Sequence, residues 1–107
     1  MITRTWHGIV PLHKKTAFLK YLDQTGINDT TSLPGNCGAY VKAVDQNEFS
    51  HVFLCTVWET LEDIISYAGK QYSIAVTYPE DDQYGLISDP IVIHQEVTST
   101  NNPFEYE

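Results

Sequence analysis

The chain has 107 residues, and its 14 Asp and Glu against 6 Lys and Arg give a formal net charge of -8 at pH 7. This length is typical of a single domain, and a hydrophobic content of 42% is too high for a disordered chain. The excess of negative charge repels nucleic-acid phosphates and anionic lipid surfaces, so we expect neither nucleic acid nor a membrane as a partner.

The N-terminal part of the chain predicts a strand, a helix and a loop. Residues 2–10 alternate along the chain and are rich in β-branched and aromatic side chains, which is typical of a strand. Pro11 suits the first turn of a helix, and apolar residues then recur at helical spacing over residues 12–22. We expect Gly26 to end this helix and the turn formers of residues 28–36 to form a shaped loop.

The middle of the chain predicts a hairpin followed by a second helix. Residues 37–44 and 49–58 have strand character, and the polar residues 45–48 separate them by the length of a short turn. Thr60, with Asp63 three residues later, is a weak form of the capping box. Apolar residues at helical spacing follow, so a second helix is expected to start there.

The last third of the chain predicts one more strand. After Gly69 we expect a further short helical piece around residues 72–76, which Pro79 and a solvated acidic turn then end. A final strand is expected over residues 91–97. The remaining residues, 98–107, form a polar tail that we expect to be loose or to lie on a neighbouring molecule.

This order of elements, βαββαβ, is the split βαβ, ferredoxin-like pattern. It predicts an α+β fold in which a four-stranded antiparallel sheet carries both helices on one face. We expect Ile2, Arg4 and Trp6 on the bare face, together with half of the last strand, which is too much apolar surface to leave in water. A homodimer that closes sheet on sheet through this open face is therefore expected.

The candidate functional residues are aromatic and imidazole side chains. We expect several of them to face the space between the sheet and the helices, where a small apolar cleft could hold a flat aromatic ligand. His7 shares a strand side with Thr3 and Thr5 and is expected to line this cleft as the catalytic acid or base, because imidazole titrates near neutral pH. The expected ligand-contacting residues are Thr5, Trp58, Tyr67, Tyr72, Tyr78 and His94.

For each of these residues a structural role is the alternative. The nitrogens of His7 or His94 could be satisfied by the main chain or by water, and His94 could be a neighbour of His7 because the first and last strands can pair. For Trp58 and the tyrosines, the alternative is hydrophobic packing with the polar end of the side chain at the surface.

Metal binding, secretion and membrane insertion have no support in the sequence. Cys37 and Cys55 are isolated, without the spacing of a metal site, and are expected to be free thiols in a reducing compartment. The first residues lack the pattern of a secretory signal, and no apolar run approaches the roughly 20 residues that span a bilayer. We expect a cytoplasmic protein without a metal.

Five segments, taken in order, resemble the antibiotic biosynthesis monooxygenase (ABM) domain. They are Thr3–Gly8, Leu33–Asn36, Val57–Glu62, Tyr78–Asp82 and His94–Val97. The resemblance covers about residues 1–97, which we expect to form one domain, and it implies a dimeric α+β barrel of ferredoxin-like units. For function, it implies a cofactor-independent monooxygenase that acts on a small phenol- or quinol-type aromatic substrate, with no cofactor.

The same family includes heme-degrading enzymes and domains without a known activity. In the heme-degrading branch, a polar cleft residue corresponds to His7 or its neighbour, and a cleft tryptophan corresponds to Tyr67. The heme-ligating histidine would fall near Val76 or Thr77, which cannot serve as an axial imidazole ligand. Two alternatives stay open: a non-catalytic dimeric module that binds a small ligand or a partner, and a heme-binding protein that uses His7 or His94.

Overall fold

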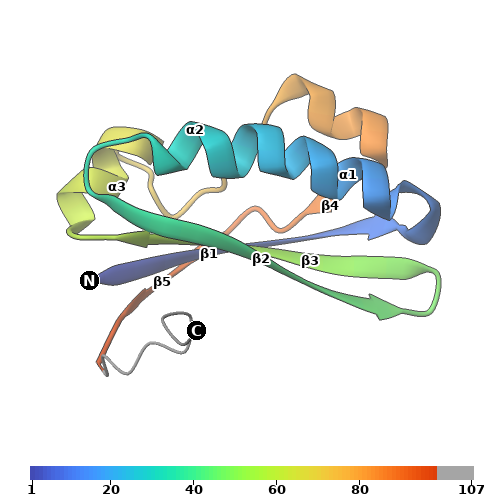
Figure 1. The fold of residues 1–107 in the computed structure, drawn as a ribbon, viewed down its shortest axis with the longest axis horizontal. Helices are drawn as coiled ribbons and strands as arrows, with labels where there is room; N and C mark the ends of the chain where they lie inside the picture. Colours follow the sequence, from blue (N-terminus) through green and yellow to red (C-terminus); the bar gives the residue numbers. More distant parts are fainter. Residues whose placement is uncertain (99–107) are drawn as a thin grey trace, which may run out of the picture.

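The computed structural model describes residues 1–98 and has the predicted ferredoxin-like α+β architecture, with the helices of the described residues on one face of an antiparallel sheet (Figure 1). The strands are β1 (Ile2–Pro11), β2 (Asn36–Gln46), β3 (Phe49–Trp58), β4 (Ile87–Ser88) and β5 (Ile93–Glu96). Their order is β2-β3-β1-β4, and β5 also pairs with β1. Two short strands therefore share the fourth position of the predicted sheet. The predicted tail falls almost wholly on residues 99–107, outside the described residues.

The first helical stretch is longer than predicted. Its consecutive parts are a 3₁₀ turn η1 (Leu12–Lys14), helix α1 (Lys15–Leu22), a π turn η2 (Asp23–Ile27) and helix α2 (Asn28–Thr31). The expectation that Gly26 ends the helix was wrong. A Cβ at Gly26 would lie 2.8 Å from Cδ2 of Leu54, so the glycine allows the helical stretch to pack closely on the sheet. The predicted loop begins only after Thr31.

The hairpin and the second helix lie where the sequence predicts them. Gln46 of β2 faces Phe49 of β3 across a two-residue turn, in which Asn47 adopts a φ of 58°. Helix α3 (Leu61–Ala68) is capped by Thr60, whose Oγ1 accepts a hydrogen bond of 3.2 Å from the main-chain N–H of Asp63. These elements are specified by local residues, and they form as expected.

The segment after helix α3 differs from the prediction. The expected helical piece around residues 72–76 is absent, because the main chain there bonds to the chain just before β5: the N–H of Ala75 donates to the carbonyl of Pro90 at 2.9 Å. Pro79 begins a helical turn, the 3₁₀ helix η3 (Pro79–Tyr84), and does not end one. The segment from 69 to 86 is therefore held to the rest of the molecule mainly by contacts distant in sequence.

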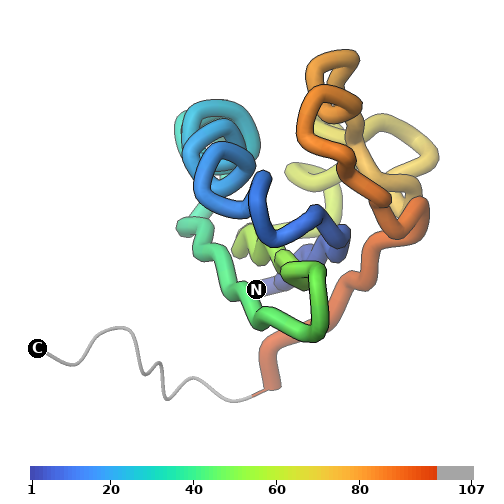
Figure 2. The backbone as a smooth tube through the Cα atoms, turned by 90° about the vertical axis from the view of Figure 1, so that its right-hand side faces the viewer, coloured from blue at the N-terminus to red at the C-terminus, as the bar shows by residue number. Residues whose placement is uncertain are grey.

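The two faces of the sheet differ in what covers them. On β1, Gly8 and Val10 are buried beneath the helices, and the alternation of the strand turns Thr5 and His7 to the opposite side. We call that opposite side the open face, because no helix of the described residues lies over it (Figure 2).

The placement of Ile2, Arg4 and Trp6 on the open face was wrong. The alternation is as predicted, but this set of side chains faces the helices: Arg4 is 5% exposed and Trp6 packs on the hydrophobic core. A Cβ at Gly8 would lie 2.6 Å from the ring of Trp6, so the indole depends on this glycine for its position. A period of two residues shows which side chains share a face, but it does not show which face the helices cover.

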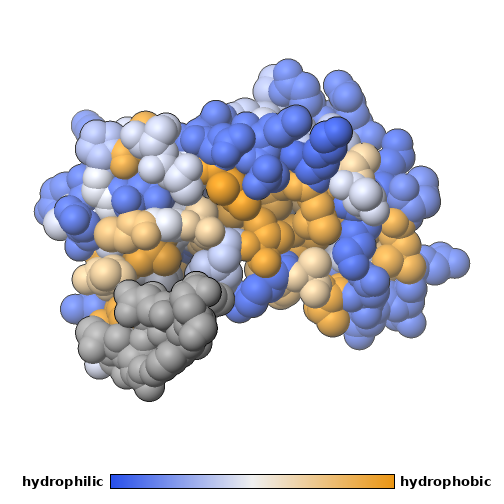
Figure 3. All heavy atoms as spheres, in the orientation of Figure 1, coloured by the Kyte–Doolittle hydropathy of each residue, from blue (hydrophilic) through white to orange (hydrophobic). Residues whose placement is uncertain are grey.

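The hydrophobic core lies between α1 and the sheet. Val10, Phe18, Leu22 and Val52 form its buried centre, and each fully buried apolar side chain stabilises the fold by about 1.5–3 kcal/mol. The outer surface of the helices is hydrophilic in Figure 3, and hydrophobic surface gathers below it at the level of the sheet. The helices thus cover one side of the sheet with an amphipathic layer.

Candidate functional site

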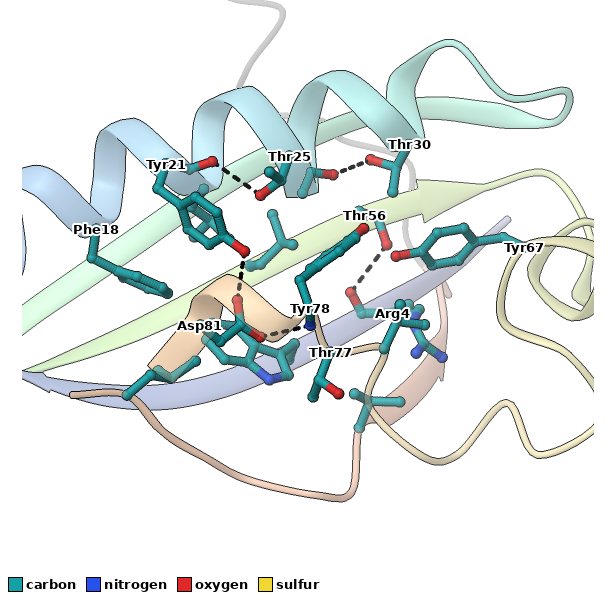
Figure 4. Close-up of a pocket in the computed structure, with 17 residues that line it drawn as sticks. Arg4, Phe18, Tyr21, Thr25, Thr30, Thr56, Tyr67, Thr77, Tyr78 and Asp81 are labelled. Carbon is teal, nitrogen blue, oxygen red and sulfur yellow. Dashed lines mark hydrogen bonds between the residues drawn. The ribbon is translucent and has the colours of Figure 1, made fainter. Parts of the chain in front are cut away.

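A cavity lies between the sheet, the α1–α2 stretch and the segment from Val76 to Leu86 (Figure 4). Its volume is about 50 Å³. Most of its wall is aromatic or aliphatic, and its polar groups come from tyrosines, threonines and two charged residues. The lining residues on which the argument depends are Arg4, Trp6, Tyr21, Tyr67, Tyr78 and Asp81.

One wall of the cavity is closed by a hydrogen bond between helix α1 and η3. The hydroxyl of Tyr21 donates to Oδ1 of Asp81 at 2.8 Å, and Oδ2 of the same carboxylate accepts from the main-chain N–H of Tyr78 at 2.9 Å (Figure 4). The ring of Tyr21 also stacks on that of Tyr84, with centroids 4.7 Å apart. Burial, followed by the hydrogen bond to Asp81, raises the pKa of Tyr21, so its hydroxyl keeps its proton and donates.

Two further tyrosine hydroxyls belong to the wall. Burial raises the pKa of Tyr67, and the positive charge of Arg4 opposes this shift. Burial also raises the pKa of Tyr78, with Tyr67 as the next cause. Both side chains are therefore neutral phenols near pH 7. The hydroxyl of Tyr78 donates to the oxygen of Tyr67, so Tyr67 is the one of the two whose proton remains for a ligand.

Arg4 supplies a buried positive charge at the end of the cavity that lies beside Tyr67. Its Nη1 donates to the main-chain carbonyl of Tyr72, and its Nη2 donates to that of Ile74 at 3.2 Å. Nη1 also lies 3.0 Å from Nε2 of His94. Burial, followed by the charge of Arg4, lowers the pKa of His94, so this ring is neutral and accepts the hydrogen bond through Nε2.

Tyr67 and Tyr78, two of the predicted ligand-contacting residues, line the cavity, and the other predicted residues do not. Trp58 is completely buried behind Tyr67, with ring centroids 5.6 Å apart. Tyr72 and His94 contact each other edge to face at 5.3 Å and lie beyond Arg4. These three residues support the wall from behind.

The expectation that His7 and Thr5 line the cleft was wrong, because both face the open side of the sheet. The ring of His7 stacks on Phe53 at 4.6 Å, and its Nε2 lies 3.1 Å from Nδ1 of His51. The hydroxyl of Thr5 lies 3.6 Å from Sγ of Cys55. His94 is paired with Arg4 across β1 and β5, so it is not the neighbour of His7 either.

Arg4, Tyr21 and Asp81 line the cavity but were not predicted as site residues. Arg4 was missed because it was predicted to lie on the open face, whereas it faces the helices. Asp81 was missed because an acidic run next to a proline is typical of a solvated turn. The only local signal for Asp81 is its position three residues after Tyr78, from which it caps the first turn of η3. No pattern in the sequence joins Tyr21 to Asp81, which are 60 residues apart.

Other kinds of site find little support in residues 1–98. No group of three or more His, Cys, Asp or Glu side chains is placed to hold a metal ion there. Val76 and Thr77 both line the cavity, and within the described chain no histidine does. Within residues 1–98, no helix has the length and hydropathy needed to span a membrane.

Comparison with known proteins finds similarity at the level of the fold. No family model matches the chain, and no similar curated protein was found. A protein from Deinococcus radiodurans described as "a putative antibiotic biosynthesis monooxygenase" superposes with a TM-score of 0.64 at 14% identity, over 95% of this chain and 97% of that chain.

Two further solved structures share the fold. Rv0793 from Mycobacterium tuberculosis matches with a TM-score of 0.57 at 12% identity, over 95% of this chain and all of its own length (100%). A dimeric ferredoxin-like protein from an uncultured marine organism matches with a TM-score of 0.53 at 14% identity, over 92% and 96% of the two chains. The resemblance to the ABM domain is thus confirmed at the level of the fold, which this chain shares with these proteins along nearly its whole length.

Proposed function

We propose that the protein is a cofactor-independent monooxygenase that oxidises a small phenol- or quinol-type aromatic compound in the cavity between sheet and helices. The observation that carries this proposal is the composition of the cavity wall: aromatic and aliphatic side chains surround one carboxylate, Asp81, and one buried cation, Arg4. Such a wall accepts a flat ring through apolar contacts and orients it through a few polar groups.

In this proposal Asp81 takes the role that the sequence analysis gave to His7. A substrate hydroxyl replaces that of Tyr21 as the donor to Asp81, which then accepts the proton of the substrate. The resulting anion is electron-rich and reduces O₂ itself. Written for the keto tautomer of the phenol, whose ring has a CH₂ group, the overall reaction is CH₂ and O₂ giving C=O and H₂O: one oxygen atom becomes the carbonyl, and the other leaves with both hydrogens. The substrate supplies all the electrons, so no external reductant is needed.

Substrate entry requires the wall to move. A cavity of about 50 Å³ holds a few water molecules but no bicyclic ring, because ligand pockets usually measure about 300–1,000 Å³. The segment that can open is η3, which is attached to α1 by side chains: the Tyr21–Asp81 hydrogen bond and the contacts of the Tyr84 ring with Tyr21 and Phe18. We propose that the substrate displaces these contacts.

The test is oxygen uptake with a panel of anthrones, naphthols and quinols, with heat-denatured protein as the baseline for autoxidation. We expect enzyme-dependent uptake that Asp81→Asn lowers by about 10²–10⁴-fold, the usual size of general-base catalysis. Asp82→Asn is the matched control, because this neighbouring carboxylate is exposed and does not line the cavity. His7→Ala is also expected to leave the rate unchanged. Absence of uptake with every compound, or full activity of Asp81→Asn, would refute the proposal.

The second candidate is a non-catalytic module of the same fold that binds a small aromatic ligand. The small number of acid–base groups favours it, because Asp81 is the one carboxylate among the described residues that line the cavity, and no histidine of the described chain lines it. Saturable binding of a panel compound, measured by a thermal shift, without oxygen consumption would select this candidate. A hemin titration in the same series tests the heme-binding alternative, for which a saturable shift of the Soret band is required.

We further propose that two copies pair through the open face. Ile87 and Ile93 are 62% and 61% exposed on this side. None of the strand residues that face the same side is Asp or Glu, although the net charge of the whole chain is -8. Two copies can therefore approach here without direct repulsion between carboxylates.

Light scattering after size exclusion is the test of this homodimer. We expect the mass of a dimer, and a shift to the monomer in Phe53→Glu, which adds a charge to the open face. Thr16→Glu adds the same charge on the exposed side of α1 and serves as the control. A monomeric wild type would contradict this part of the proposal.

We also propose a cytoplasmic location, with which the two free cysteines, Cys37 and Cys55, are compatible.

A further inference from the structure

Arg4 is the one charged residue in residues 1–98 that is buried, with an exposed fraction of 5%. A buried charge is usually paired with an opposite charge, because its removal from water is otherwise strongly unfavourable. A buried guanidinium without a carboxylate partner in the described residues therefore calls for an explanation.

No carboxylate pairs with Arg4 in the described part of the chain. The ion pair found there is Lys15 with Asp45, on the surface. The partners of Arg4 are two main-chain carbonyls and the neutral ring of His94, and its Cζ lies 5.8 Å from the centroid of the Tyr67 ring. These dipoles compensate part of the lost hydration, but they supply no negative charge.

The position of Arg4 shows where a counter-ion could come from. Arg4 lines the cavity and lies near Tyr67, whereas the carboxylate of Asp81 lies near Tyr21 (Figure 4). Asp81 is occupied by the hydroxyl of Tyr21 and by the N–H of Tyr78. The cavity is thus polarised, with an unpaired cation beside Tyr67 and a hydrogen-bonded carboxylate beside Tyr21.

We propose that the ligand of this cavity is an aromatic compound with an ionised ring oxygen, and that Arg4 binds this oxygen. The inference rests on the proposed function for the aromatic ligand and adds its charge and its orientation. A guanidinium forms strong, directional hydrogen bonds with an anionic oxygen, and the neutral phenol of Tyr67 can donate a further one. A protonated hydroxyl of the same ligand then lies toward Asp81, and the carboxylate of Asp81 accepts a hydrogen bond from it.

The test compares two ligands that differ in charge and little in shape. 2-Hydroxy-1,4-naphthoquinone is ionised at neutral pH, and its methyl ether, 2-methoxy-1,4-naphthoquinone, is not. By calorimetry with the full chain at pH 7, we expect the ionised compound to bind at least about tenfold more tightly, as hydrogen bonds between charged groups in a buried site imply. Equal affinities, or no binding of either compound, would overturn the inference.

The variants assign this difference to Arg4. In Arg4→Met the affinity for the ionised compound should fall to that of the ether, and the affinity for the ether should not change. Arg4→Lys keeps the charge without the planar guanidinium and should retain part of the preference. If Arg4→Met folds and still prefers the ionised compound, the proposal that Arg4 binds the ring oxygen is refuted, and the role of Arg4 is to hold the main chain of residues 72–74. If Arg4→Met does not fold, the comparison of the two ligands on the wild type tests the preference for the ionised compound, and Arg4→Lys tests its assignment to Arg4: an unchanged preference in Arg4→Lys would then overturn that assignment.

The result is distinguishable from the test of the proposed function. A preference for the ionised compound without oxygen consumption would reject the monooxygenase and keep the anion site. Oxygen consumption together with equal binding of the two naphthoquinones would keep the monooxygenase and reject the anion site. 2-Naphthoate, which has a carboxylate in place of the ring oxygen, is the third ligand: if it alone binds, the ionised ring oxygen is refuted as the group that is recognised.

Discussion

The hydrogen bond from Tyr21 to Asp81 joins helix α1 to η3 across the cavity, and Tyr21→Phe removes it without removing the ring. The ring contacts of Tyr21 with Phe18 and Tyr84, at centroid distances of 6.1 and 4.7 Å, do not involve the hydroxyl. The variant therefore leaves no large void, and its effect reports on the hydrogen bond.

The expected loss of stability follows from the environment of this bond. A hydrogen bond to a charged group contributes about 1.5–3 kcal/mol. Tyr21 is only partly buried, and Asp81 keeps its bond from the N–H of Tyr78, so the carboxylate is not left without a partner. We expect a loss near the lower end, about 1–2 kcal/mol at pH 7, out of a total of about 5–15 kcal/mol for a domain of this size.

The pH dependence of this difference has a definite sign. The pKa of Tyr21 is raised in the folded state, whereas the unfolded chain loses this proton near pH ~10. The contribution of the hydroxyl is therefore complete below that pH and is lost as the pH rises toward the raised value. The wild type should lose stability above about pH 10 more steeply than Tyr21→Phe, so that the difference between them shrinks.

Urea denaturation followed by circular dichroism, at pH 7 and at several values above 9, measures both effects. Tyr84→Phe is the matched control, because it deletes the same atom from a neighbouring ring whose hydroxyl has no hydrogen-bond partner in residues 1–98. Amide hydrogen exchange in η3 should be faster in Tyr21→Phe than in this control. Equal stabilities of Tyr21→Phe and Tyr84→Phe at pH 7 would refute the reasoning. So would a difference in stability between the wild type and Tyr21→Phe that grows as the pH rises.

Three further substitutions test the packing around the site. Trp58→Ala removes a fully buried ring behind Tyr67 and should cost about 3–5 kcal/mol in urea denaturation; a loss below about 1 kcal/mol would mean that the site collapses freely. Thr60→Ala removes the N-cap of α3 and should cost about 0.5–2 kcal/mol, with faster amide exchange in its first turn; unchanged exchange would argue against the cap. Gly8→Ala places a Cβ 2.6 Å from the ring of Trp6, so we expect a loss of about 1–3 kcal/mol and a changed near-UV spectrum; an unchanged spectrum would contradict this close approach.

Elements with local signals could be predicted to within a residue or two. Residues 49–58 and 61–68 form a strand and a helix with the predicted bounds, because β-branched and aromatic residues favour the first and the Thr60 cap marks the start of the second. The end of the first helical stretch was predicted wrongly at Gly26. A glycine after a helical pattern usually indicates a helix end, but here it allows close packing on Leu54.

The structure of the segment after Gly69 could not be predicted from neighbouring residues either, because contacts distant in sequence decide it. The spacing of its apolar residues is compatible with a helix. However, the N–H of Ala75 bonds to the carbonyl of Pro90, and the N–H of Val92 bonds to the carbonyl of Ser73. Hydrogen bonds between segments distant in sequence replace the local ones here, and a window of neighbouring residues contains no information about them.

The sequence by itself determined the class of fold, because the period of apolar residues and the turn and cap residues are local properties that specify the order of the elements. It also identified Tyr67 and Tyr78, which line the cavity. Only the tertiary structure decided that Arg4 faces the helices and His7 the open side, and only it joined Tyr21 to Asp81. The physical reason is that alternation groups the side chains of a strand into two sets. Which set is buried depends on packing against helices elsewhere in the chain.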